Sequence, residues 1–420
     1  MSAPETSPPN LSDLDARFAR FGTEYDRRRE AAHAVVRRWE WYSAEAYDLR
    51  PLWYERDLGR PGRRLAQRPS LERDHCRIGF DSEDHPVVVE EYSGFLHGKL
   101  YYETFREHPD GAGPVTEAHF RAGGEPIYLH EYRFEAGRIR SASMVATGGG
   151  GYEEYEYTDD RVTGIATYHA ERADRPDSRL RPLAPYQKIH AAYDDAGLSR
   201  LEIAWAGPAE PQVELRYERP PAGFTLDDAI ETVRRELVRQ VPEVLRAMAI
   251  DEPVYAVALG YLPADPIGVT VHVGFESDRY DWLVAQAEDD AEADTFVLWN
   301  PCDLRGQEPV DFGEAAGTAR LLCQELTLAD ADADESVDAD ESVDADEPGT
   351  SGVNERGRRL LCAAAAELNA QDWAGVVPIS DDFVVFAADW EMVDFDRNLP
   401  ECVPPASLAL LRDRGLLVEC

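Results

Sequence analysis

Apolar residues recur at spacings of three and four along the first part of the chain, which is the pattern of a helix with one buried face. The series runs through Leu11, Leu14, Phe18, Phe21, Tyr25, Ala31, Val35, Trp39 and Tyr42. This spacing predicts a helical segment over residues 11–50, within a helical N-terminal region of residues 1–75. Gly22 is the position at which the helix is expected to break.

The pattern changes in residues 76–223, where short segments alternate apolar and polar residues and are separated by Gly, Asp and Pro. A period of two predicts β-strands and the separators predict tight turns, so this region is expected to form a series of β-hairpins. An irregular repeat of an aromatic residue, an acidic turn and a strand runs through it. Its three copies are Phe134–Ile139, Tyr157–Val162 and Tyr193–Leu198.

This repeat resembles the YD-type hairpin repeats of bacterial Rhs-like proteins. The Phe134–Ile139 copy also keeps Gly-Arg after its turn. The resemblance implies an extended antiparallel sheet and brings no catalytic chemistry with it.

Residues 224–420 mix helical and strand patterns after a Pro-Pro-Ala-Gly linker at 220–223. Thr225 and Asp228 form a capping box at the start of a helix whose apolar face includes Val233 and Leu237. Strands are expected at 254–261, 269–275, 295–299 and 383–388, and further helices near 278–287, 313–327, 354–370 and 404–414. Helices around one sheet predict an α+β domain, and the chain as a whole is expected to be α+β.

Charge is distributed unevenly along the chain. The formal net charge is −39, and residues 1–75, 76–223 and 224–420 carry +1, −10 and −30. Within the last region, ten of residues 330–347 are acidic and none is basic, and Asp-Ala-Asp-Glu-Ser-Val occurs twice. Such a segment repels itself, so a disordered acidic insertion is predicted over residues 329–352. A calcium loop is the alternative, but the glycine and spaced terminal glutamate of an EF-hand are missing.

This charge excludes some partners and favours others. Phosphate contacts need cations, so binding to nucleic acid or to an anionic membrane is disfavoured. A basic protein partner or a salt-rich cytoplasm fits the acidic C-terminal region. No stretch of 18 apolar residues predicts a membrane span, and the polar Met1–Asn10 segment does not match a signal peptide. A cytoplasmic protein is expected, with six free cysteines and no CxxC pair.

Two groups of residues are candidates for chemistry. Asp389, Glu391, Asp394 and Asp396 are the best carboxylate cluster, and Asp389 and Glu391 share a side if the preceding strand continues. They are candidate magnesium ligands, although a solvated acidic rim is the competing and favoured interpretation. Cys302 follows a predicted strand, and His272 is the candidate base for such a nucleophile. His272 alternates with the valines of its strand, so solvent exposure is the competing interpretation. No cofactor motif occurs.

The C-terminal region resembles a group of uncharacterised bacterial domains associated with toxin–immunity loci. Val254–Tyr261 after a helix, and Phe383–Asp389 followed by Val403-Pro404 and Leu411–Leu417, are the segments that resemble them. The resemblance implies a binding protein without a cofactor. The leading hypothesis is therefore a non-catalytic immunity-type protein that neutralises a basic toxin domain, with the 389–396 rim as its candidate contact surface. A metal-dependent or cysteine hydrolase, and acidity that only reflects salt adaptation, are the alternatives.

Overall fold

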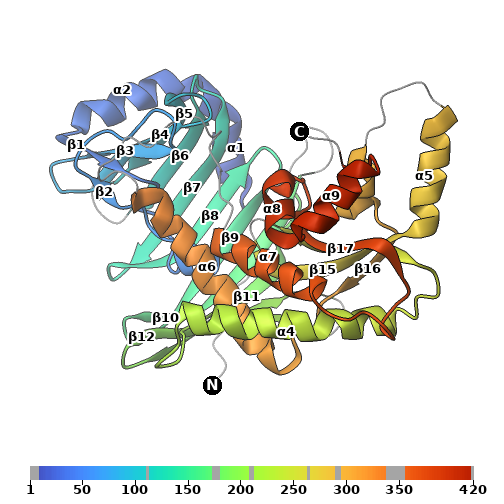
Figure 1. Ribbon diagram of the computed structural model, residues 1–420. Helices are drawn as coiled ribbons and strands as arrows, with labels where there is room; N and C mark the ends of the chain where they lie inside the picture. Colours follow the sequence, from blue (N-terminus) through green and yellow to red (C-terminus); the bar gives the residue numbers. More distant parts are fainter. Residues whose placement is uncertain are drawn as a thin grey trace. The chain divides into compact units, whose positions relative to one another are not determined.

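The computed structural model describes residues 9–109, 113–172, 180–207, 212–262, 265–288, 295–336 and 355–417. The chain divides between Arg219 and Pro220 into two compact units (Figure 1). We call them the N-terminal unit and the C-terminal unit. None of the helices in the described ranges is long and apolar enough to cross a membrane.

The N-terminal unit is built on one antiparallel sheet of thirteen strands, almost all of them in chain order. This arrangement confirms the predicted series of hairpins. The strands are β1 (Arg38–Tyr42), β2 (Arg64–Leu65), β3 (His75–Phe80), β4 (Pro86–Ser93), β5 (Lys99–Glu107), β6 (Val115–Arg121), β7 (Pro126–Glu135), β8 (Arg138–Ala146), β9 (Gly149–Thr158), β10 (Arg161–Glu171), β11 (Ala184–Asp194), β12 (Gly197–Trp205) and β13 (Val213–Glu218).

The turns of the predicted repeat close three of these hairpins. Glu135 pairs with Arg138 across Ala136 and Gly137, and both turn residues have positive φ, at 49° and 77°. Two-residue turns with this handedness match the twist of the strands that they join. The second and third copies close the β9–β10 and β11–β12 hairpins, also with two residues between the paired ends of the strands.

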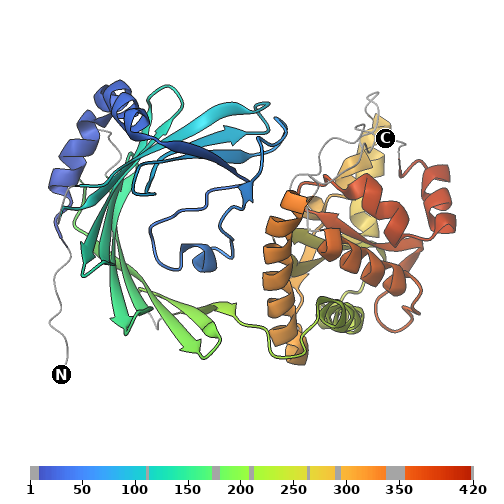
Figure 2. The same cartoon turned by 90° about the vertical axis from the view of Figure 1, so that its left-hand side faces the viewer.

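The sheet is strongly curved, and different segments cover its two faces (Figure 2). Helices α1 (Ser12–Phe21) and α2 (Tyr25–Val35) lie on the outer face, where Phe18 and Phe21 pack with a buried cluster that includes Phe105 and Phe120. The segment between β1 and β3 crosses the inner face with the short helix α3 (Trp53–Arg56). There Leu49 and Leu52 pack against a second cluster.

The expected helix over residues 11–50 is correct only up to Val35. The chain turns at Gly22–Glu24 between α1 and α2, as expected, but Arg38–Tyr42 forms strand β1. Trp39 and Tyr42 fit a helical spacing as well as a strand. The segment becomes a strand because Arg38–Tyr42 pairs with β3 residue by residue, which is a contact between distant parts of the chain. The pairing of β1 with β3 spans the boundary that was expected between residues 75 and 76. The N-terminal helices therefore belong to the same unit as the hairpins.

The C-terminal unit has a four-stranded sheet in the order β16-β15-β14-β17, in which β14 and β17 run parallel. The strands expected at 254–261 and 269–275 are confirmed as β14 and β15, which pair antiparallel as a hairpin. The strands are β14 (Val254–Leu262), β15 (Asp265–Phe275), β16 (Gly306–Pro309) and β17 (Ile379–Asp389). The helices are α4 (Leu226–Ala247), α5 (Glu276–Glu288), α6 (Ala316–Ser336), α7 (Glu355–Asn369), α8 (Phe395–Cys402) and α9 (Pro405–Asp413), with the 3-10 turns η2 (Thr295–Leu298), η3 (Pro301–Asp303) and η4 (Gly313–Ala315).

Thr225 caps α4 as predicted, since its Oγ1 accepts a hydrogen bond from the Asp228 amide at 3.2 Å. Helices pack around the sheet and bury one apolar core, which confirms the α+β class. The strand predicted at 295–299 is wrong. Thr295–Leu298 is a 3-10 turn, and Leu298 and Trp299 are buried in the core from this turn and not from a strand.

The prediction of disorder is wrong for the first residues of the acidic insertion. Helix α6 continues to Ser336, eight residues into the segment 329–352 that was expected to be disordered. A helix that has already formed extends at low cost, because each further residue adds one backbone hydrogen bond. Residues 337–352 lie outside the described residues.

Candidate functional site

The four predicted carboxylates do not form one cluster. β17 ends at Asp389, so Glu391 lies in the following turn and not on the same strand face. The buried Asp389 carboxylate accepts hydrogen bonds from the amides of Glu391, Val393 and Asp394, at 3.0, 3.1 and 2.9 Å. Both of its oxygens are therefore occupied by the backbone of the turn that it shapes.

The other three carboxylates also differ in environment. Asp394 is buried, and burial together with the neighbouring Asp389 raises its pKa. Glu391 and Asp396 are exposed. The interpretation as a uniformly solvated rim is thus wrong for Asp389 and Asp394. Among the described residues, no three of these four carboxylates gather at metal-ligand distance.

His272 and Cys302 come near the same residue, Trp390. The His272 ring meets the Trp390 ring edge-on at 5.7 Å, and the exposed Cys302 thiol lies 3.9 Å from the Trp390 carbonyl oxygen. Within the described ranges no hydrogen bond joins the thiol to the imidazole. The expected solvent exposure of His272 is wrong. Its side chain is buried, Gly260 of the neighbouring strand leaves room for it, and burial lowers its pKa.

The inner face of the N-terminal unit holds a buried polar network that the sequence pattern did not indicate. Arg106 donates to Glu117 at 2.5 Å and to Glu45 at 3.2 Å, and Tyr132 donates to Glu117 at 3.2 Å. A second pair joins Arg56 to Glu153 at 3.0 Å. Because Glu45 and Arg56 belong to the segment between β1 and β3, these ion pairs fix that segment to the sheet.

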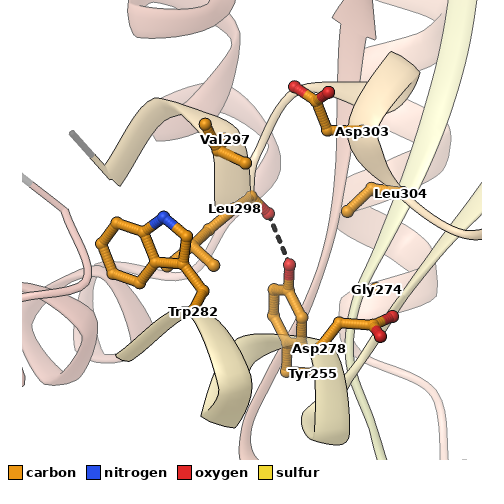
Figure 3. Close-up of a pocket in the computed structure, with 8 residues that line it drawn as sticks. All are labelled: Tyr255, Gly274, Asp278, Trp282, Val297, Leu298, Asp303 and Leu304. Atoms are coloured by element: carbon orange, nitrogen blue, oxygen red, sulfur yellow. Dashed lines mark hydrogen bonds between the residues drawn. The ribbon is translucent and has the colours of Figure 1, made fainter. Parts of the chain in front are cut away.

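A small pocket in the C-terminal unit is a candidate for binding (Figure 3). Its volume is about 60 Å³. It lies between α5, the ends of β14 and β15, and the turns η2 and η3. The lining residues are Tyr255, Gly274, Asp278, Trp282, Val297, Leu298, Asp303 and Leu304.

The pocket is held open by specific contacts. The Tyr255 hydroxyl donates a hydrogen bond of 2.7 Å to the Leu298 carbonyl and so ties η2 to β14 (Figure 3). Gly274 is needed at its position, because a Cβ atom there would lie 2.7 Å from the Tyr255 ring. The Arg279 guanidinium lies 4.7 Å from the centre of the same ring and pairs with the buried Asp382 at 3.0 Å. The walls are therefore fixed before any ligand arrives.

The rim of the pocket is acidic. Asp278 and Asp303 are exposed at its edge, and Arg305 lies 3.3 Å from the Asp278 carboxylate. In the part of the chain that the structure describes, no cation or donor group is bonded to the Asp303 carboxylate. The pocket thus combines apolar walls with a carboxylate that is open to an incoming cation.

Exposed apolar residues occur on α5 and η2, two of the elements that line the pocket. Tyr280, Leu283 and Val284 lie on one face of α5 with 65%, 43% and 43% of their surface exposed. Phe296 and Val297 of η2 are 44% and 42% exposed. Together we call these five residues the α5 surface. Clustered exposed apolar side chains next to polar ones are typical of protein interaction sites, whereas isolated ones are common anywhere.

The size of the pocket limits what it can bind. Sites for metabolites and cofactors usually have volumes of about 300–1,000 Å³. A pocket of about 60 Å³ accommodates the end of one side chain. The sequence signal for this site was present but weak: Tyr280, Leu283 and Val284 follow helical spacing beside acidic residues.

Comparisons with known proteins do not extend this description. No protein family model matches the chain, and none of the curated proteins shows significant sequence similarity to it.

Proposed function

We propose that the chain is a non-catalytic binding protein that recognises a basic protein partner through the pocket and the α5 surface. The observation that carries this proposal is the acid-rimmed pocket of side-chain size, whose lining elements α5 and η2 also carry exposed apolar residues. An arginine or lysine side chain of the partner fits this chemistry, since its methylene stem suits the Tyr255 and Trp282 walls and its charged head suits Asp303.

The charge of the whole region supports a basic partner. Residues 224–420 carry 43 acidic and 13 basic residues. Such a field attracts cationic proteins over a distance and speeds their encounter, while the apolar contacts hold the complex. The same field is unsuited to nucleic acid and to anionic membranes. The proposed place of action is the cytoplasm.

The resemblance to domains of toxin–immunity loci supports a narrower proposal. A basic toxin domain would be the partner, and the chain would neutralise it by covering its surface. In that case co-expression of the chain protects cells from such a toxin domain, and a chain with an altered pocket does not. Unchanged protection by the pocket variant would mean that another surface makes the contact.

A direct test uses a peptide of alternating arginine and leucine residues, carrying a fluorescent label, at 0.15 M salt. We expect Asp278→Asn combined with Asp303→Asn to weaken binding about tenfold, which corresponds to about 1.4 kcal/mol. Asp396→Asn with Asp413→Asn is the matched control, because it removes two exposed charges of the same unit that do not line the pocket. Equal losses in both variants would show that only net charge matters and would contradict the proposed site.

A further inference from the structure

Helix α2 presents three polar side chains to the sheet of the N-terminal unit. Tyr25, Arg29 and His33 are four residues apart and therefore share one helix face. Under them, Glu90 of β4 and Glu103 of β5 stand directly opposite each other. These two glutamates are buried, with 2% and 0% of their surface exposed.

The potential ligand atoms of this group face one another. The His33 Nε2 atom is buried, has no hydrogen-bond partner and lies 3.8 Å from Glu90 Oε1. The nearest ligand atoms of His33, Glu90 and Glu103 all lie within 4.8 Å of one another. An unpaired buried nitrogen beside two buried carboxylates needs a partner, since a buried polar atom without one costs free energy.

The remaining contacts of the two carboxylates leave these atoms available. Arg77 and Tyr92 both donate to Glu90 Oε2, at 2.7 Å, so Oε1 is the oxygen that faces His33. Glu103 accepts one bond on each oxygen, from Arg29 at 2.8 Å and from the Tyr25 hydroxyl. Each oxygen therefore keeps a second lone pair. Partners of this kind orient the ligands in many metal sites.

We propose that His33, Glu90 and Glu103 bind one divalent transition-metal ion, of which Zn²⁺ is the best match. One imidazole and two carboxylates form a ligand set that zinc accepts, with water in the fourth position. Zinc–ligand distances of about 2.0–2.2 Å place neighbouring ligand atoms about 3.3 Å apart. The three side chains therefore need to close by a small movement when the ion enters.

The charges around the site set its expected affinity. Arg29 and Arg77 already balance the two carboxylates, so a metal ion must compete with them. Arg29 is the weaker competitor, because 43% of its side chain is exposed and it can turn into solvent. Burial and Arg29 lower the pKa of His33, which leaves its ring neutral and able to donate a lone pair to the ion at neutral pH.

The site has a built-in reporter. The Trp39 ring centre lies 5.4 Å from that of His33. Co²⁺ bound at His33 therefore quenches Trp39 fluorescence, and a Trp39→Phe variant loses that part of the signal. Cobalt also distinguishes this site from the free cysteines, since thiolate ligation gives a strong near-ultraviolet absorption band that oxygen and nitrogen ligands do not give.

The experiment is equilibrium dialysis of the full chain against Zn²⁺, followed by thermal melts with and without the ion. We expect one Zn²⁺ per chain, a higher melting temperature with zinc, and at least tenfold weaker binding in His33→Ala. His190→Ala is the matched control, because His190 is an exposed histidine on β11 of the same sheet. Arg29→Met is expected to bind zinc more tightly, since it removes the competing cation.

The outcomes separate a metal site from a purely structural cluster. If His33, Glu90 and Glu103 serve only packing, Arg29→Met lowers stability and brings no gain in zinc affinity. Absence of stoichiometric zinc binding in the wild type, or full binding by His33→Ala, would overturn the proposal. Binding of the arginine–leucine peptide is independent of this site, so failure of either test leaves the other unaffected.

Discussion

At the scale of single residues, the burial and the hydrogen-bond partners of a carboxylate depend on the groups that the fold brings to it. Asp389 and Glu391 are two positions apart in the sequence, yet one is buried under three backbone amides and the other is exposed. Glu90 and Glu103 belong to different strands and stand directly opposite each other in the sheet. A carboxylate-rich stretch is therefore a poor guide to where carboxylates act together.

Asp389→Ala tests the role of the first of these residues. The substitution leaves three amides of the turn without an acceptor, so we expect the C-terminal unit to lose about 3 kcal/mol of stability. Glu391→Ala, the matched control, should change stability by less than about 0.5 kcal/mol because Glu391 is exposed. Urea denaturation measures both. We expect neither wild type nor variant to bind Mg²⁺ stoichiometrically by calorimetry, and stoichiometric binding that depends on Asp389 would favour the enzyme alternative.

Glu91 predicts how the stability of the N-terminal unit depends on pH. Burial, together with the Glu45 and Glu117 carboxylates, raises the pKa of Glu91 to about 7. Between about pH 4.5 and 7 the folded chain keeps a proton that the unfolded chain releases, so this residue's contribution to stability falls as pH rises through that range. Glu91→Gln should therefore raise the stability of the N-terminal unit by about 1 kcal/mol at pH 8.

The pH comparison is the control for this variant. At pH 4.5 Glu91 is protonated in the folded state, so glutamine and glutamic acid should give the same melting temperature. A gain of equal size at both pH values would show that side-chain shape, and not ionisation, explains the effect.

At the scale of elements, local signals fixed the ends of helices and turns well. Thr225 caps α4 through the Asp228 amide, and Gly22 separates α1 from α2. The same signals failed for Arg38–Tyr42, because its aromatic residues fit a strand and a helix about equally. Only the pairing with β3 makes this segment a strand. They failed again for α6, which extends into an acidic segment.

Thr225→Ala tests the cap of α4. Loss of the hydroxyl leaves the Asp228 amide without its acceptor, and such substitutions typically cost about 1 kcal/mol. Thr225→Ser keeps the acceptor and should retain most of the stability. Thermal melts of the full chain compare the two variants, and equal destabilisation by both would contradict a capping role.

At the scale of the whole molecule, the boundary between the two units lies close to the point where the chain becomes strongly acidic. The hairpin sheet and its helices form one unit, and the strongly acidic residues 224–420 make up most of the other. Acidic surface of this density fits both a basic partner and a salt-rich cytoplasm. These two explanations differ in what they require of the chain without its partner.

Calorimetry of the full chain across a salt series separates them. For a protein adapted to a basic partner, we expect the C-terminal unit to be folded at 0.15 M salt, where the screening length is about 8 Å. Its melting temperature should rise by only a few degrees toward 1 M salt. Binding of the arginine–leucine peptide should weaken over the same range. Unfolding of the C-terminal unit below about 1 M salt would instead support salt adaptation, and the charge would no longer argue for a basic partner.

The sequence by itself determined the features that depend on neighbouring residues. Alternating residues and two-residue turns predicted the hairpins, the capping box predicted the start of α4, and composition placed the negative charge in the C-terminal half. Each follows from contacts within a few positions along the chain, where periodicity and turn chemistry act.

Only the tertiary structure decided which distant residues meet. His33 reaches Glu90 and Glu103 because α2 lies across β4 and β5, and Trp282 meets Tyr255 and Asp303 because α5 packs beside η2 and η3. Burial of His272 and Asp389 likewise depends on neighbours from other elements. The physical reason is that burial, ion pairing and cavity shape arise from long-range packing, and a single sequence carries no local signal for these contacts.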